Sequence, residues 1–146
     1  MIRHADRQAL AREFGATDIV TERGDVGVAR IKALTGGYGA HSVIEAVGTQ
    51  ESMWQAINAT RPGGHVGYVG VTHGVQLDGL ALFFTGVHLH GGPAPVRRFL
   101  PELIQLIWDR EIDPGKVFDL TLPLADAAAG YRAMDERRAT KVLLTL

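Results

Sequence analysis

Short apolar runs alternate along the chain with segments that carry apolar residues at helical spacing. The runs at 42–48 and 65–71 end in or contain glycine, and the run at 87–90 is closed by Gly91-Gly92-Pro93. Continuous apolar runs of this length are typical of strands buried on both faces of a parallel sheet. We therefore expect strands at these three positions, with further short extended segments at 18–20, 117–122 and 141–146.

Helical spacing of the apolar residues predicts helices at 6–14, 25–34, 50–60, 94–110 and 126–137. Within the fourth helix, Pro101 cannot donate a backbone hydrogen bond to residue 97, which predicts a kink or a restart there. Strands that alternate with helices indicate the α/β class, with right-handed crossovers and a parallel sheet. Ligands of such folds bind at the carboxyl ends of the strands, which fall here at 47–48, 69–71 and 90–91.

The amino-acid composition limits the class of protein but does not indicate a function. The 146 residues suffice for one globular domain, and 46% hydrophobic and 21% charged residues are typical of folded chains. A net charge of −1 without a basic cluster argues against nucleic acid as a partner. No long apolar segment or apolar leader is present, so we expect a cytoplasmic protein without a membrane partner. Zero cysteines exclude disulfides and thiolate metal sites.

Six segments, in this order and spacing, resemble the medium-chain zinc-type alcohol dehydrogenases over nearly the whole chain. They are 4–18 (HADRQALA and FGATD), 45–49 (EAVGT), 61–64 (RPGG), 69–71 (VGV), 87–92 and 141–146 (KVLLTL). The resemblance implies a partial Rossmann-like, three-layer parallel sheet that lacks its first strand and most of its second. It also implies a truncated dinucleotide-binding domain at 1–120, followed by a helix and strand at 121–146 that return to the catalytic domain in the family.

The departures from the family limit the expected chemistry. The motif Gly-x-Gly-x-x-Gly, whose backbone amides and helix N-terminus hold the pyrophosphate, is absent from the sequence. In the family the zinc ligands lie upstream of this region, so no residue here is assigned to zinc, which we expect to be absent. We expect a fragment of an NAD(P)-dependent oxidoreductase of alcohols or aldehydes that is inactive alone. The alternatives are a non-enzymatic dimerising or ligand-binding remnant and, more weakly, a site for a methyl-donor cofactor.

The resemblance implies a set of cofactor-binding positions. Ile2 occupies the place of the acidic ribose ligand of NAD-specific members, and the adjacent Arg3 suits a 2′-phosphate, which favours NADP over NAD. Lys141 matches a basic position near the pyrophosphate. The remaining candidates are Val47, Gly48, Val69, Gly70, Val71 and His90. The alternative interpretation of Arg3 and Lys141 is that each is a solvated surface charge. For the other candidates, the alternative is plain strand packing.

Other polar residues near the strand ends give weaker indications of a metal or catalytic site. His88 and His90 point to one side of their expected strand, but zinc needs at least three protein ligands, so we expect no metal site. Glu45 and Asp78 have no partner at a defined spacing and are not predicted to be general acids or bases.

Association with a second copy is expected at either of two places. In the family the strand at 87–90 pairs with its twofold mate. A sheet without its first strands also exposes an edge, and an exposed apolar edge favours association. We therefore expect a homodimer through Val87 to His90 or through that edge. The segment 141–146 is expected to pack against its own chain or a neighbour, or to be disordered.

Overall fold

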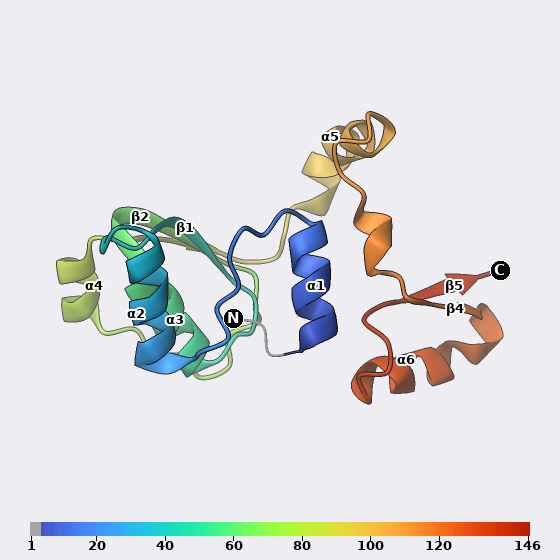
Figure 1. Ribbon diagram of the computed structural model, residues 1–146, viewed down its shortest axis with the longest axis horizontal. Coiled ribbons are helices and arrows are strands. Elements are labelled where there is room, and N and C mark those ends of the chain that lie inside the picture. The colour runs from blue at the N-terminus through green and yellow to red at the C-terminus, as the bar shows by residue number, and fades with distance from the viewer. Residues whose placement is uncertain (1–3) are drawn as a thin grey trace. The chain divides into compact units, whose positions relative to one another are not determined.

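The computed structural model describes residues 4–146, which form two compact units (Figure 1). The first unit is Asp18–Ala94, and the second combines residues 4–17 with Pro95–Leu146. Both units contain parallel strands joined through helices, so the expected parallel α/β class is confirmed. The division expected after residue 120 stays a prediction.

The first unit is built around a parallel three-stranded sheet in the order β1-β2-β3. Ile44 of β1 lies beside Gly67 of β2, which lies beside His90 of β3, so all three strands end at one edge. The elements in chain order are α2 (Gly24–Leu34), β1 (Ala40–Glu45), α3 (Gln50–Ala59), β2 (Thr60–Tyr68), α4 (Gly79–Thr85) and β3 (His88–Gly91).

The core of this unit lies on one face of the sheet, beneath α3 (Figure 1). Met53 and Ile57 of α3 pack against Val66 of β2, which is completely buried. Side chains alternate between the faces of a strand, so His65 lies on the opposite face and is exposed. The apolar side chain of Ile44 is 76% exposed on β1.

Side-chain caps fix where α3 and α4 begin. Thr49 and Ser52 form a capping box at α3, in which the Thr49 hydroxyl accepts from the Ser52 amide. Asp78 accepts hydrogen bonds from the amides of Leu80 and Ala81 at the start of α4. The apolar run at 80–84 is therefore a short helix.

The expected strands of the first unit differ from the structure at several points. The strand expected at 42–48 runs from Ala40 to Glu45, so Val47 and Gly48 lie in the loop that follows it. Residues 18–20 form no strand, because a strand needs a hydrogen-bonded neighbour and no described strand pairs with them. The strand expected at 65–71 begins earlier, at Thr60, and ends at Tyr68. Pro62, Gly63 and Gly64 lie within β2, at a place where the register against β1 shifts between Ala40 and Ser42.

The second unit contains a parallel pair of strands, β4 (Leu120–Pro123) and β5 (Val142–Thr145). Its other elements are α1 (Ala5–Glu13), α5 (Val96–Trp108), the 3-10 turns η1 (Pro114–Val117) and η2 (Leu124–Asp126), and α6 (Ala127–Asp135). The C-terminal segment thus packs against its own chain, which confirms one of the three expectations for it. The strand expected at 117–122 starts at Leu120, because η1 occupies the preceding residues.

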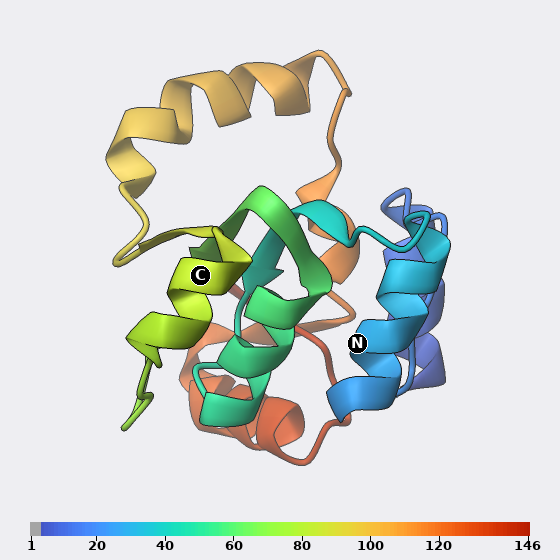
Figure 2. The ribbon, with the colours of Figure 1, turned by 90° about the vertical axis from the view of Figure 1, so that its left-hand side faces the viewer.

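Helix α5 is continuous through Pro101 (Figure 2). The helix therefore does not restart at Pro101, because one missing backbone donor leaves the other hydrogen bonds of the helix in place. The kink, which was the other expectation for this position, stays a prediction. Within residues 4–146, none of the helices combines the length and the apolar character needed to cross a membrane.

Asp119 ties the start of β4 to the start of β5. Its carboxylate accepts hydrogen bonds from the amides of Thr140, at 2.9 Å, and Lys141, at 3.3 Å. The bond from the Thr140 amide is the main reason why the pKa of Asp119 lies below its ordinary value. We expect Asp119→Asn to weaken this link by about 1 kcal/mol.

The measurement is NMR-detected amide hydrogen exchange at Thr140 and Lys141, which should become faster in Asp119→Asn. Asp113→Asn is the control, because no capping hydrogen bond is made by the Asp113 side chain. Unchanged exchange at both amides would show that the carboxylate does not hold the strand pair.

Candidate functional site at the strand ends of the first unit

The loops that follow β1 and β2 are packed tightly against each other. Gly48 has a positive φ of +86°, and a Cβ at this position would collide with the carbonyl oxygen of Val71. A Cβ on Gly70 would lie 2.5 Å from the Gly48 nitrogen and 2.7 Å from the Val47 nitrogen. Glycine is therefore required at both positions, and the two loops form one wall.

Glu45, the last residue of β1, holds the two loops of this wall in place through hydrogen bonds. Its side chain is 3% exposed, and its Oε1 accepts hydrogen bonds from the amides of Val47, at 2.7 Å, and Gly48, at 2.9 Å. Its backbone carbonyl accepts from the amides of Val69 and Gly70. One residue thus fixes both loops.

The second carboxylate oxygen of Glu45 is buried against Gly70. A Cβ on Gly70 would lie 2.8 Å from this Oε2. Oε2 makes no hydrogen bond of standard geometry with the described residues, although the Ser52 hydroxyl is near enough to influence the group. Burial raises the pKa of Glu45, but the interactions with Ser52, Gly48 and Val47 together lower it below its ordinary value. The group is therefore a carboxylate at neutral pH.

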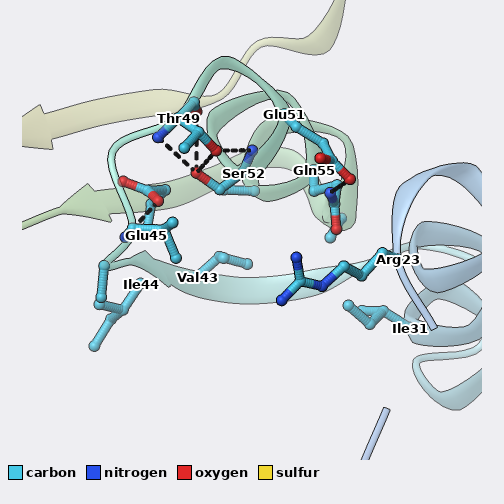
Figure 3. Close-up of a pocket in the computed structure, with 13 residues that line it drawn as sticks. Arg23, Ile31, Val43, Ile44, Glu45, Thr49, Glu51, Ser52 and Gln55 are labelled. Carbon is cyan, nitrogen blue, oxygen red and sulfur yellow. Dashed lines mark hydrogen bonds between the residues drawn. The ribbon is translucent and has the colours of Figure 1, made fainter. Parts of the chain in front are cut away.

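A cavity of about 190 Å³ runs along β1 between this strand and the helices α2 and α3 (Figure 3). Arg23, the residue before α2, extends its guanidinium toward β1. On α3, the Glu51 carboxylate accepts a hydrogen bond from the Gln55 amide at 3.0 Å. Val43 and Ile31 supply apolar walls, and Glu45 also lines the cavity, at the end opposite to Arg23 (Figure 3).

The structure brings five of the candidate residues together. Val47, Gly48, Val69, Gly70 and Val71 all lie in the wall at the ends of β1 and β2. Its three valines are exposed to 69%, 57% and 73%, in that order, so the wall presents small apolar side chains to solvent.

Of the other three candidates, only His90 belongs to the described residues of the first unit. His90 is exposed on β3, with its ring centroid 5.7 Å from that of His65. Lys141 lies in the second unit, where its amide is held by Asp119. Arg3 lies outside the described residues. The cofactor role of all eight candidates stays a prediction.

The described residues do not suit a catalytic zinc ion. No group of three or more histidine, cysteine, aspartate or glutamate side chains within 4–146 is arranged to hold a metal. His65 stacks on His88 with ring centroids 4.8 Å apart, which is ring packing rather than convergence of nitrogens on one point. No catalytic step is therefore assigned to zinc in this chain.

Comparison with known proteins decides the family. The sequence model of the zinc-binding dehydrogenases matches residues 2–109 of this chain. The chain belongs to the zinc-binding dehydrogenase family. The resemblance noted in the sequence is thereby confirmed.

Individual relatives match over most of the chain. A "probable zinc-binding alcohol dehydrogenase" of Mycobacterium tuberculosis is 40% identical over 143 residues, covering 96% of this chain and 36% of the relative. An NADP-dependent isopropanol dehydrogenase of Entamoeba histolytica is 32% identical over 117 residues, covering 74% of this chain and 31% of the relative. The chain thus spans about a third of the length of these curated relatives.

A solved structure supports the same fold. The alcohol dehydrogenase of Thermus sp. ATN1 superposes with a TM-score of 0.90 at 28% identity, covering 99% of this chain and 42% of that chain. The Rossmann-like expectation is confirmed by this similarity.

Sequence reasoning missed the part played by Glu45, which was considered only as an acid or base. A signal was present, because an acidic residue lies three positions before Gly48 at a strand end. Such a carboxylate can accept the backbone amides of the turn that follows. Arg23 had no sequence signal, since only the tertiary fold places it beside β1.

Proposed function

We propose that this chain forms the nicotinamide-ribose wall of an NAD(P)-dependent alcohol or aldehyde oxidoreductase and lacks activity by itself. The observation that carries the proposal is the tightly packed glycine wall at the carboxyl ends of β1 and β2, with its exposed valines. Carboxyl ends of parallel strands are where dinucleotides bind in this class of sheet. Membership of the zinc-binding dehydrogenases supports the choice of ligand.

The wall fits one part of such a cofactor. Gly48 and Gly70 let the two loops pack closely against each other, and the exposed Val47, Val69 and Val71 offer apolar contact to a ring or ribose. In the bound state a nicotinamide supplies hydride transfer, while the protein supplies position and exclusion of water. These residues would orient the ring and shield it on one side.

The choice of NADP over NAD rests on Arg3 and on a relative. The Entamoeba histolytica protein is named as NADP-dependent. A guanidinium beside the adenine ribose would pair with a 2′-phosphate. We propose NADP as the preferred cofactor.

Titration with NADPH tests the proposal. We expect saturation-transfer NMR to show contact between NADPH and the 146-residue chain, with a Kd weaker than about 1 mM. The sequence has no Gly-x-Gly-x-x-Gly motif to hold the pyrophosphate, so only the ribose-side contacts contribute. Val71→Glu, which places a charge on the exposed wall, should abolish the signal.

The outcomes separate the candidate functions. Micromolar affinity for NADPH, or turnover of an alcohol, would contradict the proposal that this chain holds only the ribose side of the cofactor and is inactive by itself. A signal retained in Val71→Glu would move the contact away from the wall. Complete absence of contact with NADPH and NADH would favour a non-enzymatic remnant, and contact with S-adenosylmethionine alone would favour a methyl-donor ligand.

A further inference from the structure

The loop that follows the wall, residues 71–78, lies in the first unit and is irregular. The structure describes all of these residues, and they form neither a helix nor a strand. Gly74 has a positive φ of +66°, and Val75 packs against the core cluster of the unit. Because the loop belongs to no hydrogen-bonded ladder, its course depends on the contacts that neighbouring segments make with it. The loop begins at Val71, so its course also decides where this part of the wall lies.

Gln50, the first residue of α3, binds the backbone of this loop with both polar atoms of its side chain. Its Oε1 accepts a hydrogen bond from the Gln76 amide at 2.7 Å, and its Nε2 donates to the Gln76 carbonyl oxygen at 3.0 Å. A residue of a neighbouring antiparallel strand exchanges the same two bonds with its partner. A side-chain amide can do so because it carries a donor and an acceptor side by side.

The contact at Gln50 continues a series of contacts that starts in the wall. Gly48 lies against Val71, and the Gly48 carbonyl oxygen accepts a hydrogen bond from the His73 amide at 3.3 Å. Further along both segments, Gln50 binds Gln76. The contacts therefore advance in the same direction along the two segments, and the pair at Gln50 and Gln76 ends the series.

We propose that Gln50 is a positioning residue of the wall. It ties Gln76 to the start of α3, whose place is fixed by its capping box and by the core residues of the helix. The upstream end of the loop is fixed by β2, and Gln50 fixes the downstream part, so that Val71 stays against Gly48. The part of this inference that concerns a cofactor rests on the proposed function, whereas the part that concerns the loop does not.

NMR-detected amide hydrogen exchange in Gln50→Ala tests whether the loop is held. The decisive amide is that of His73, because the substitution does not remove its own bond to Gly48. We expect its protection to fall about fivefold, since the loop opens more often once both bonds to residue 50 are lost. Asn58→Ala is the matched control on α3, because the Asn58 side chain donates to the Trp54 carbonyl oxygen of the same helix. Unchanged protection of His73 in Gln50→Ala, or an equal loss in the control, overturns the proposal.

The variant Gln50→Glu separates hydrogen bonding from the mere filling of space. An ionised glutamate can accept from the Gln76 amide but has no donor for the carbonyl oxygen, so at neutral pH the His73 amide should be as poorly protected as in Gln50→Ala. Protonation supplies an O–H donor, so protection should return as the pH falls through the ordinary pKa of glutamate, about 4.3. The nearby titratable residues Glu51, His73 and Asp78 are present in both proteins, so the wild type at the same pH is the reference. Wild-type protection in Gln50→Glu at neutral pH contradicts the proposal.

Titration with NADPH distinguishes this inference from the proposed function. In Gln50→Ala the Kd for NADPH should rise about fivefold, because the loop less often places Val71 in the wall. Faster exchange at His73, together with no NADPH contact in the wild type, would contradict the proposed function and support the hold of Gln50 on the loop. NADPH contact with the same Kd in wild type and Gln50→Ala would overturn the positioning role and leave the proposed function in place.

Discussion

Replacing Gly48 with alanine is expected to lower the free energy of unfolding by about 2–4 kcal/mol. Two effects add at this position. The φ of +86° is strained for any residue with a Cβ, and that Cβ would collide with the carbonyl oxygen of Val71. The obstacle is backbone, so it cannot turn away as a flexible side chain would. Urea denaturation followed by circular dichroism measures the change.

Gly67→Ala is the matched control for this prediction. Gly67 lies on β2, its φ is not positive, and a Cβ there meets nothing within 4 Å. An alanine in a strand also loses less conformational entropy than glycine, so stability should be unchanged or slightly higher. Equal effects of the two substitutions would show that the loops after β1 and β2 are not packed as described.

Glu45→Gln is expected to lower the free energy of unfolding by about 1–3 kcal/mol at neutral pH. The glutamine oxygen can still accept from the amides of Val47 and Gly48. Its NH₂ group then takes the place of Oε2, buried against Gly70, and the negative charge that strengthens the bonds from the Val47 and Gly48 amides is lost. Glu51→Gln controls for the loss of one negative charge, since Glu51 is exposed.

The effect of Glu45→Gln should depend on pH in a defined direction. The pKa of Glu45 is lower in the folded state than its ordinary value, so its carboxylate stabilises the fold above the ordinary range, about pH 4.3. This contribution is lost as the pH falls through the lowered pKa. The free energies of unfolding of the wild type and of Glu45→Gln should therefore become more similar as the pH falls. Urea denaturation midpoints at several pH values measure this change. A difference that grows on acidification would mean that Glu45 is held protonated in the folded protein.

The sequence predicted most elements of the first unit but not their ends. Apolar periodicity located α3 and β1 to within a few residues, because these elements carry the core residues Met53, Ile57 and Val43. It failed at residues 18–20, where two apolar residues have no strand to pair with. Strands depend on partners distant in sequence, whereas helices are stabilised by bonds within one segment.

The candidate site was predicted in part, through the family resemblance. Glycines at the strand ends identified the wall, because two backbone segments can approach each other closely only where no Cβ lies between them. The resemblance could not show that Gly48 and Val71 are in contact, nor that one glutamate holds both loops. Those facts depend on the register of β1 against β2.

By itself the sequence determined the α/β class, the parallel strands and the zinc-binding dehydrogenase resemblance, because each is written in local patterns of apolar residues, glycines and short motifs. Only the tertiary structure decided that Glu45 holds the two loops of the wall and that Arg23 reaches the cavity beside β1. Packing determines which segments far apart in the chain come into contact and which side chains are buried as a result. Local sequence patterns do not contain this information.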